Sequence, residues 1–345
     1  MVMTPRERVL AAMRREKIDR PPVAVFTQSA TIGQMEALGV FWPEAHSNPK
    51  AMAKLGAGQA DVLGFEAVRA PFCLTAEAET MGCTVDPGKQ DRTPMLKKHP
   101  FKFDPMMGEY DEPKIMDPQV FLKSGRAAKV LEGIKLLKEQ KGKDYVVVAG
   151  NTGPFTLAGH LVSTENLVFG IMMAPEEVTK WMKAVTPICK AYTQALADAG
   201  ADVVQMSEPS SSTDLLSPDM FDDFSGCYVK DSLASLKGAN SVLHICGNTT
   251  SLLPNMIATG VSGLSIEEKV DPVEGVKKVR AVNKKTFLVG NVGVVNPLLQ
   301  GTPAECQKHA EIVKAAGFDV VSPGCGLSAL IKNENLIALV KGVKG

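Results

Sequence analysis

Eight short runs rich in β-branched and aromatic residues recur along the chain, and a segment with helical patterning follows each of them. The runs cover residues 23–27, 62–66, 145–150, 202–207, 241–246, 263–267, 286–291 and 319–324. Strands separated by helices pair in parallel through right-handed crossovers. Eight such units in 345 residues favour an α/β fold, a (β/α)8 barrel that forms a single domain over residues 1–345. An open doubly wound sheet is the alternative.

Two further segments lie outside this repeat. Thr4, Pro5 and Glu7 form a capping-box pattern, which predicts a helix over about residues 5–16 as an N-terminal extension of the barrel. Residues 74–117 carry turn signals at Asp86-Pro87-Gly88 and several prolines. We expect an inserted hairpin and loop there, after the second strand. Such a long connection either covers part of a site or partner surface, or is a decoration without function.

The composition excludes several classes of function. Lys+Arg and Asp+Glu both number 38, so no net charge favours nucleic acid or an anionic membrane as a partner. No apolar run approaches the roughly 20 residues that span a bilayer, and the charged N-terminus does not resemble a signal peptide. The seven cysteines are odd in number and scattered, which is typical of a reducing compartment. We therefore expect a cytoplasmic protein. No G-x-G-x-x-G follows the first run and no P-loop motif occurs.

The segments SVLHICGN and SPGCGL carry the candidate metal-binding side chains. His244 and Cys246 are two residues apart in an apolar run, so in a strand both point to one face. Cys325 lies between two glycines after the last run. In a barrel the carboxyl ends of the strands meet at one face. An imidazole and two thiols suit Zn²⁺, and ligands on different strands are more typical of a catalytic site than of a structural one.

A fourth ligand is expected from the end of the sixth strand. Glu267 is our choice there, while Glu268 would point the other way if the strand runs that far. Glu208 and Ser265 could also reach inward. We assign Glu267 and His244 a catalytic as well as a ligating role. Two thiolates, an imidazole and a carboxylate make zinc a poor activator of water but a good holder of a thiolate, so the predicted reaction is alkylation of a thiol.

The chain resembles the uroporphyrinogen decarboxylase superfamily and, within it, the methylcobamide:coenzyme M methyltransferases of methylotrophic methanogens. The resemblance runs from about residue 4 to 340, through RERVLAAMRREKIDRPPVAVFTQSAT, GFEAVRAPF, GNTGPFTLAGH, LHICGNT, SIEEKVD, LVGNV and SPGCGL. Ordinary decarboxylases of the superfamily lack the His-x-Cys with a distal Cys. They carry an arginine-rich motif where this chain has FTQSAT, which argues against decarboxylation.

The resemblance implies a zinc enzyme that moves a methyl group from a methylated corrinoid, held on a separate corrinoid protein, to the thiol of coenzyme M (2-mercaptoethanesulfonate). His244, Cys246 and Cys325 match the family's metal positions. The order of ligands also resembles cobalamin-independent methionine synthase, where a glutamate occupies the intervening position, and this supports Glu267. A decarboxylase-like enzyme and a non-enzymatic corrinoid- or metal-binding protein are the alternatives.

The sulfonate of coenzyme M needs a recess rich in hydrogen-bond donors. The substrate-binding candidates are polar residues at or after strand ends: Arg69, Gln28, Asn151, Thr152, Glu208 and Asn291. The remaining cysteines lack a metal-like context and are interpreted as small hydrophobic residues; they are Cys73, Cys83, Cys189, Cys227 and Cys306.

Overall fold

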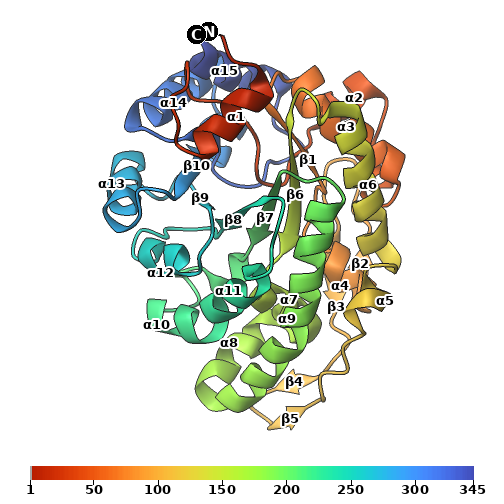
Figure 1. Ribbon diagram of the computed structural model, residues 1–345. Coiled ribbons are helices and arrows are strands. Elements are labelled where there is room, and N and C mark those ends of the chain that lie inside the picture. The colour runs from red at the N-terminus through yellow and green to blue at the C-terminus, as the bar shows by residue number, and fades with distance from the viewer. Residues whose placement is uncertain (1) are drawn as a thin grey trace.

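A computed structural model describes residues 2–345, and within them seven parallel strands form one curled sheet (Figure 1). In spatial order the strands are β1 (Ala67–Ala70), β6 (Val146–Thr152), β7 (Val203–Ser207), β8 (Asn240–His244), β9 (Gly263–Ser265), β10 (Phe287–Val292) and β11 (Val320–Pro323). The order in space follows the order in sequence, as in a barrel rather than in a doubly wound sheet. The predicted α/β barrel is confirmed.

The first predicted run, residues 23–27, closes the barrel between β11 and β1 with little regular pairing. Val23 forms a single parallel bridge with Val321, and the N–H of Glu66 donates to the carbonyl of Val23 at 2.8 Å. Three residues later the guanidinium of Arg69 donates to the carbonyl of Phe26 at 2.8 Å. The first expected strand is therefore an extended segment that has one bridge and a few backbone hydrogen bonds to its neighbours instead of a regular ladder.

The second predicted run, residues 62–66, is wrong as a strand. Val62 caps the helix α3 (Pro49–Asp61), and Gly64 follows with a φ of 79°, a left-handed conformation that glycine adopts without strain. The strand β1 begins only at Ala67, after the predicted run has ended. The apolar character of the run was read correctly, since Leu63 and Phe65 are buried, but their burial comes from packing and not from strand pairing.

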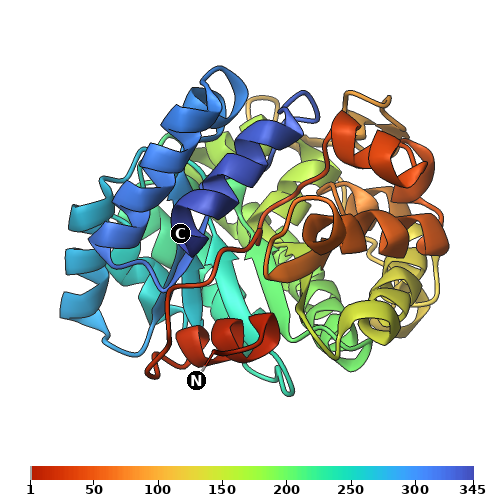
Figure 2. The same ribbon diagram turned by 90° about the horizontal axis from the view of Figure 1, so that it is seen from above.

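Helices surround the sheet, as the view from above shows (Figure 2). Those of the barrel layer include α2 (Ile32–Leu38), α3, α6 (Gly125–Lys141), α7 (Pro154–Val162), α8 (Thr164–Met173), α9 (Pro175–Asp198), α10 (Pro218–Phe221), α11 (Cys227–Leu233), α12 (Leu253–Ala258), α13 (Pro272–Val282), α14 (Pro303–Ala316) and α15 (Asn333–Lys344). Short helical turns are η1 (Glu44–His46), η2 (Pro209–Ser211), η3 (Asp222–Gly226) and η4 (Val294–Leu299).

The N-terminal helix α1 (Pro5–Met13) begins with the predicted capping box, in which Glu7 and Thr4 exchange hydrogen bonds. Its apolar face packs onto the interior side chains at the amino ends of the strands, among them Val146 and Val203. The C-terminus and the start of the described chain both lie at the top of Figure 1, and the view in Figure 2 shows that they are separated in depth. The helix thus plugs the end of the barrel opposite to the predicted site.

The insertion after β1 contains two antiparallel hairpins, whereas the turn signals indicated one hairpin and a loop. They are β2 (Thr84–Asp86) with β3 (Met95–Lys98), and β4 (Phe103–Asp104) with β5 (Glu109–Tyr110). The short helix α4 (Ala76–Thr80) precedes them and α5 (Pro118–Phe121) follows. Gly88 has a φ of 81°, and its N–H donates to the carboxylate of Asp86 at 3.0 Å. The predicted hairpin is confirmed in kind.

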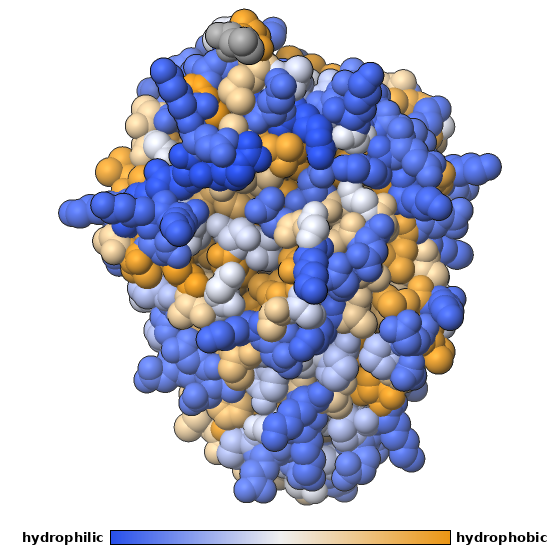
Figure 3. Space-filling view, in the orientation of Figure 1, coloured by the Kyte–Doolittle hydropathy of each residue, from blue (hydrophilic) through white to orange (hydrophobic). Residues whose placement is uncertain are grey.

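Side chains on the strands alternate between the barrel interior and the helical layer. On β6, Val146 and Val148 face inward, whereas Val147 and Ala149 pack under the surrounding helices. The outer surface mixes hydrophilic residues with small apolar patches (Figure 3). Among the described residues, no helix is both long and apolar enough to cross a membrane. The inward-facing parity carries down each strand and decides which side chains reach the carboxyl end of the barrel.

Candidate metal centre

Three ligand atoms meet at the carboxyl ends of β8 and β11. Cys246 Sγ lies 3.4 Å from His244 Nε2 and 3.5 Å from Cys325 Sγ, and Cys325 Sγ lies 3.6 Å from His244 Nε2. A tetrahedral zinc with bond lengths of about 2.3 Å to sulfur and about 2.0 Å to nitrogen separates its ligand atoms by about 3.5 to 3.8 Å. The sulfurs are too far apart for a disulfide bond of about 2.05 Å. The predicted trio is brought together at spacings that suit a metal ion.

The imidazole of His244 is oriented from behind by β9. Its Nδ1 lies 3.1 Å from both the carbonyl oxygen and the hydroxyl of Ser265. The carbonyl only accepts, so Nδ1 carries the proton and Nε2 is left as the free electron pair that faces the thiols. His244 and Ser265 are both buried, and they are paired in the register of β8 and β9. The strand pairing itself therefore sets the tautomer of the ligand.

The pKa values of the two thiols are shifted in opposite directions. The hydrogen bond from Cys246 and the nearby His244 lower the pKa of Cys325 to about 4, against the effect of burial. The thiolate of Cys325, together with burial, raises the pKa of Cys246. The pair thus holds one proton fewer than two ordinary thiols at neutral pH. This brings the site closer to the deprotonated form that metal binding requires.

Glu267 follows β9 and stands beside the trio without being part of it. Its Oε2 accepts a hydrogen bond from the N–H of Gly247, directly after Cys246, and its charge raises the pKa of Cys246. The cluster of ligand atoms within 4.8 Å of one another comprises His244, Cys246 and Cys325. A ligating role of Glu267 stays a prediction. The strand ends at Ser265, before Glu268, and the carboxylate of Glu268 accepts a hydrogen bond from the N–H of Val294 at 3.0 Å.

Gln28 is the substrate-binding candidate that lies beside the thiols. A Cβ on Gly326, the neighbour of Cys325, would come within 3.3 Å of its Oε1, and its Nε2 lies 3.4 Å from the hydroxyl of Ser207. The preceding residue, Thr27, donates its hydroxyl to the carbonyl of Cys325 at 2.7 Å. The segment that closes the barrel thus also holds the Cys325 loop in place.

Arg69 is buried inside the barrel and already has acceptors. Besides Phe26, its guanidinium contacts the carbonyl of Pro71 and donates to Gln205 Oε1 at 3.1 Å. Burial lowers the pKa of Arg69 to about 9. Gln205 in turn donates to the hydroxyl of Ser207 at 2.9 Å. A polar chain thus runs from Arg69 toward Gln28, and direct sulfonate binding by Arg69 stays a prediction.

Three other candidates are engaged in contacts that position the face around β6. Asn151 lies on the same face of β6 as Val147 and Ala149, toward the helical layer, and its Nδ2 donates to the hydroxyl of Thr193 in α9 at 2.9 Å. The N–H of Thr152 donates to Glu77 of α4 at 2.7 Å. Glu208 accepts from the N–H groups of Phe155 and Thr156 at 2.8 Å and so caps α7. Their roles in substrate binding stay predictions, which these contacts do not support.

Asn291 is hydrogen-bonded to the backbone on either side of Glu268. Its Nδ2 donates to the carbonyl of Val270 at 2.8 Å and to that of Glu267 at 3.3 Å. It lines a cavity with Glu268 and His309, between β10 and α14. Asn291 therefore supports the backbone at Glu267, and its contact with a substrate stays a prediction.

The residues that position the three candidate ligands were not identified from the sequence. Ser265 was considered only as a ligand, although it carries the partner of His244 on both its carbonyl and its hydroxyl. Ser207 and Gln205 were not considered. Parity along the strands was the available signal, because Gln205, Ser207, His244 and Ser265 all share the inward face of paired strands.

Comparisons with known proteins agree with this geometry. The uroporphyrinogen decarboxylase (URO-D) family matches residues 4–345. The chain is 36% identical over 342 residues to the methylcobamide:CoM methyltransferase MtaA of Methanosarcina barkeri, covering 98% of this chain and 96% of that protein. It is 35% identical over 347 residues to MtbA of Methanosarcina acetivorans, covering 99% and 98%.

The structure superimposes on that of a methyltransferase from Methanosarcina mazei with a TM-score of 0.90 and 36% identity, covering 99% of this chain and 98% of that one. Fold, ligand spacing and full-length similarity lead to one conclusion. The chain belongs to the uroporphyrinogen decarboxylase family and, within it, to the methylcobamide:CoM methyltransferases.

Proposed function

We propose that this chain is a zinc-dependent methyltransferase that moves a methyl group from a methylated corrinoid, bound to a separate protein, to the thiol of coenzyme M. The observation that carries the proposal is the trio of Nε2 and two Sγ atoms, spaced 3.4 to 3.6 Å apart at the carboxyl end of the barrel. Relatives whose names specify the same reaction match the chain over nearly its full length.

The donor set fits Zn²⁺ in particular. Two sulfurs and one imidazole nitrogen are soft to borderline ligands, which select zinc over magnesium or calcium. His244, Cys246 and Cys325 would hold the ion, with Glu267 as the proposed fourth ligand. When bound there, zinc would lower the pKa of a substrate thiol so that it is deprotonated at neutral pH.

The chain's own residues would then position the reactants. The sulfur of coenzyme M attacks the methyl carbon, a carbon–sulfur bond forms, and the carbon–cobalt bond breaks with its electron pair on cobalt, which leaves Co(I) and a thioether. The thiol proton passes to solvent before attack. Transfer between two bound groups depends mainly on alignment, so rigid placement of the ligands by β8, β9 and β11 supports the rate.

The sulfonate end would lie near Gln28, whose amide nitrogen faces the same side of the barrel as Ser207. Arg69 would support this region through Gln205 rather than by contact. This assignment predicts that Gln28→Ala raises the KM for coenzyme M with a smaller effect on kcat. A Gln28→Glu change places a like charge near the sulfonate and is expected to raise KM further.

The test mixes zinc-loaded protein, free methylcobalamin and mercaptoethanesulfonate, and follows the conversion of Co(III) to Co(I) by absorbance. Thiol-dependent demethylation is expected from the wild type and from Cys227→Ser, whose cysteine is exposed and lies outside the trio. Cys325→Ser is expected to lose zinc and activity together. Demethylation that is absent with a full equivalent of zinc rejects the proposal. Homocysteine in place of mercaptoethanesulfonate separates coenzyme M transfer from methionine synthesis.

A further inference from the structure

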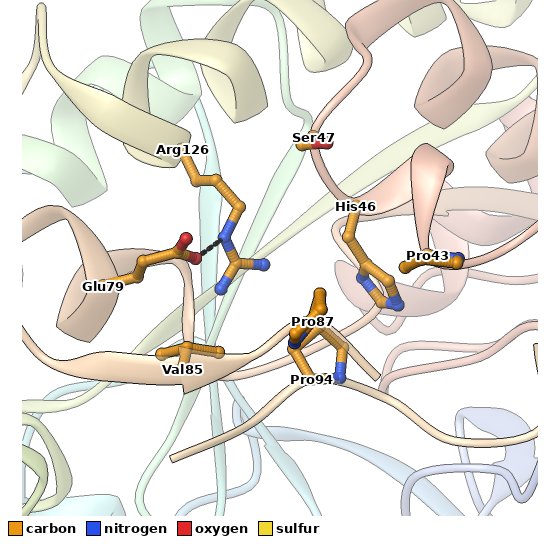
Figure 4. A pocket seen from close by; sticks show the side chains of 8 residues that line it. All are labelled: Pro43, His46, Ser47, Glu79, Val85, Pro87, Pro94 and Arg126. Carbon is orange, nitrogen blue, oxygen red and sulfur yellow. Dashed lines mark hydrogen bonds and ion pairs between the residues drawn. The ribbon is translucent and has the colours of Figure 1, made fainter. Parts of the chain in front are cut away.

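A second cavity, of about 110 Å³, lies beneath the inserted β2–β3 hairpin. Its walls come from η1, α4, the hairpin and the start of α6, and they are lined by Pro43, His46, Ser47, Glu79, Val85, Pro87, Pro94 and Arg126. In Figure 4 the ring of His46 and the guanidinium of Arg126 extend into the same space. None of these residues belongs to the metal centre.

Cys73 lies behind the cavity wall, where it contacts Arg126, one of the lining residues. Arg126 donates from one terminal nitrogen to Cys73 Sγ at 3.2 Å and from the other to the hydroxyl of Thr75 at 2.7 Å, while its Nε pairs with Glu79. Thr75 in turn lies with its hydroxyl 3.6 Å from Cys73 Sγ. Arg126 and Cys73 are only 7% and 6% exposed. A sulfur that receives a buried guanidinium N–H is arranged as a thiolate would be.

His46 is the second polar group of this cavity, and its ring is unsatisfied. It is 3% exposed, and among the described residues neither of its ring nitrogens has a hydrogen-bond partner. Trp42 and Phe72 pack around the ring at centroid distances of 4.8 and 6.1 Å. A buried imidazole without a partner is costly unless it serves a ligand or a reaction. Its position provides a proton donor at the cavity wall.

The electrostatics around Cys73 differ from those around the other buried cysteines. Burial alone raises the pKa of Cys73, yet His46 and Arg126 lower it to about 5. Burial raises the pKa of Cys83 to about 12, that of Cys306 to about 11, and that of Cys189 still further. The titratable and charged groups that act on Cys73 or respond to it are His46, Arg69, Glu77, Glu79, Arg126 and Tyr192.

We propose that Cys73 is a second reactive thiolate of this chain, a modification site for small uncharged electrophiles, of which hydroperoxides are the natural class. The thiolate attacks the terminal oxygen of the hydroperoxide, a sulfur–oxygen bond forms and the oxygen–oxygen bond breaks. Sulfur is oxidised to a sulfenic acid, the peroxide is reduced, and the leaving alkoxide takes a proton from His46 or from water. The interpretation of Cys73 as a small hydrophobic residue is replaced by this assignment, which does not depend on the proposed methyl transfer.

Cys83 provides a matched control in the same segment. It is 5% exposed, and one tryptic peptide, residues 70–89, carries both cysteines, so fragment spectra give the ratio of their labelling directly. The zinc-loaded full-length protein is treated with iodoacetamide at pH values from 5 to 9, and separately with hydrogen peroxide followed by dimedone. At pH 6.5 a much larger fraction of Cys73 than of Cys83 is expected to be thiolate. The lower intrinsic nucleophilicity of a low-pKa thiolate partly offsets this advantage. We therefore expect Cys73 to be labelled on the order of 100-fold faster than Cys83.

The pH profile and two variants separate ionisation from mere access. Labelling of Cys73 is expected to be flat from pH 6 to 9 in the wild type, and to rise with pH in Arg126→Gln. His46→Asn is also expected to make the labelling rise with pH, which keeps the test available if Arg126→Gln does not fold. Equal labelling of the two cysteines, a rate at Cys73 that rises tenfold per pH unit in the wild type, or no dimedone adduct at Cys73 overturns the proposal.

Discussion

The hydrogen bonds behind His244 allow a quantitative prediction for Ser265→Ala. The Nδ1–H group has two acceptors at 3.1 Å, the hydroxyl and the carbonyl of the same residue, and the substitution removes only the first. One neutral hydrogen bond contributes about 0.5 to 1.5 kcal/mol. Since the carbonyl remains, we expect a loss of about 0.5 to 1 kcal/mol, or zinc binding about two- to fivefold weaker. Losing the only partner of a ligating imidazole typically costs about 10- to 100-fold.

Competition with a chelator of known zinc affinity measures this effect. Ser322→Ala is the matched control, because Ser322 is also a buried serine of the barrel, but its hydroxyl contacts the carbonyl of Pro323 at 3.0 Å and no ligand. The control is expected to bind zinc like the wild type. A loss beyond about 30-fold in Ser265→Ala would refute the reasoning and would make the hydroxyl a ligand in its own right.

Three further predictions concern the fourth ligand, the α7 cap and a buried acid. Glu267→Gln is expected to keep one zinc per chain with roughly tenfold weaker binding in the same chelator assay, since the trio is intact; unchanged binding argues against ligation. Gly153→Ala is expected to lower the free energy of unfolding by about 1 to 3 kcal/mol in urea titrations, because the new Cβ would lie 2.4 Å from the carboxylate of Glu208. Gly275→Ala, whose new Cβ meets only side-chain methyl groups at 3.1 Å, is its control. Burial raises the pKa of Glu77 to about 7, although the N–H of Thr152 opposes this shift. That value lies above the pKa of an unfolded glutamate, so the contribution of Glu77 to stability is full below about pH 4 and is lost as the pH rises through about 7. Relative to Glu77→Gln, the wild type is expected to lose up to about 3 kcal/mol of stability between pH 5 and 8, and parallel curves for the two proteins would contradict this.

The local features of the fold were predictable because short segments encode them. The capping boxes at Thr4 and Thr302 begin α1 and α14, since each needs only a hydroxyl and a carboxylate three residues apart. The hairpin turn at Asp86 follows in the same way from glycine and proline. The prediction of residues 62–66 failed because apolar runs of this length fit a buried turn as well as a strand, and Gly64 decides between them.

The substrate-binding candidates show what strand ends alone leave open. Asn151 and Thr152 are adjacent on one strand, so only one of them can face the interior, and parity could have separated them. Arg69 was expected to be available for an anion, yet the barrel supplies it with two carbonyls and an amide oxygen. A long side chain on an interior strand finds its partners across the barrel, and those partners are distant in sequence.

For the site, the sequence by itself determined that His244 and Cys246 share one face, since two residues is the repeat of a strand. It also supplied Cys325 at the end of a last strand. Only the tertiary structure decided that Cys325, 79 residues away, lies 3.5 Å from Cys246, because closure of the barrel brings β8 and β11 to one rim. The same closure buries Arg69. The packing of η1 and α6 places His46 and Arg126 next to Cys73. The two-residue repeat of a strand determines which face a side chain is on, whereas tertiary packing determines which side chains lie next to it.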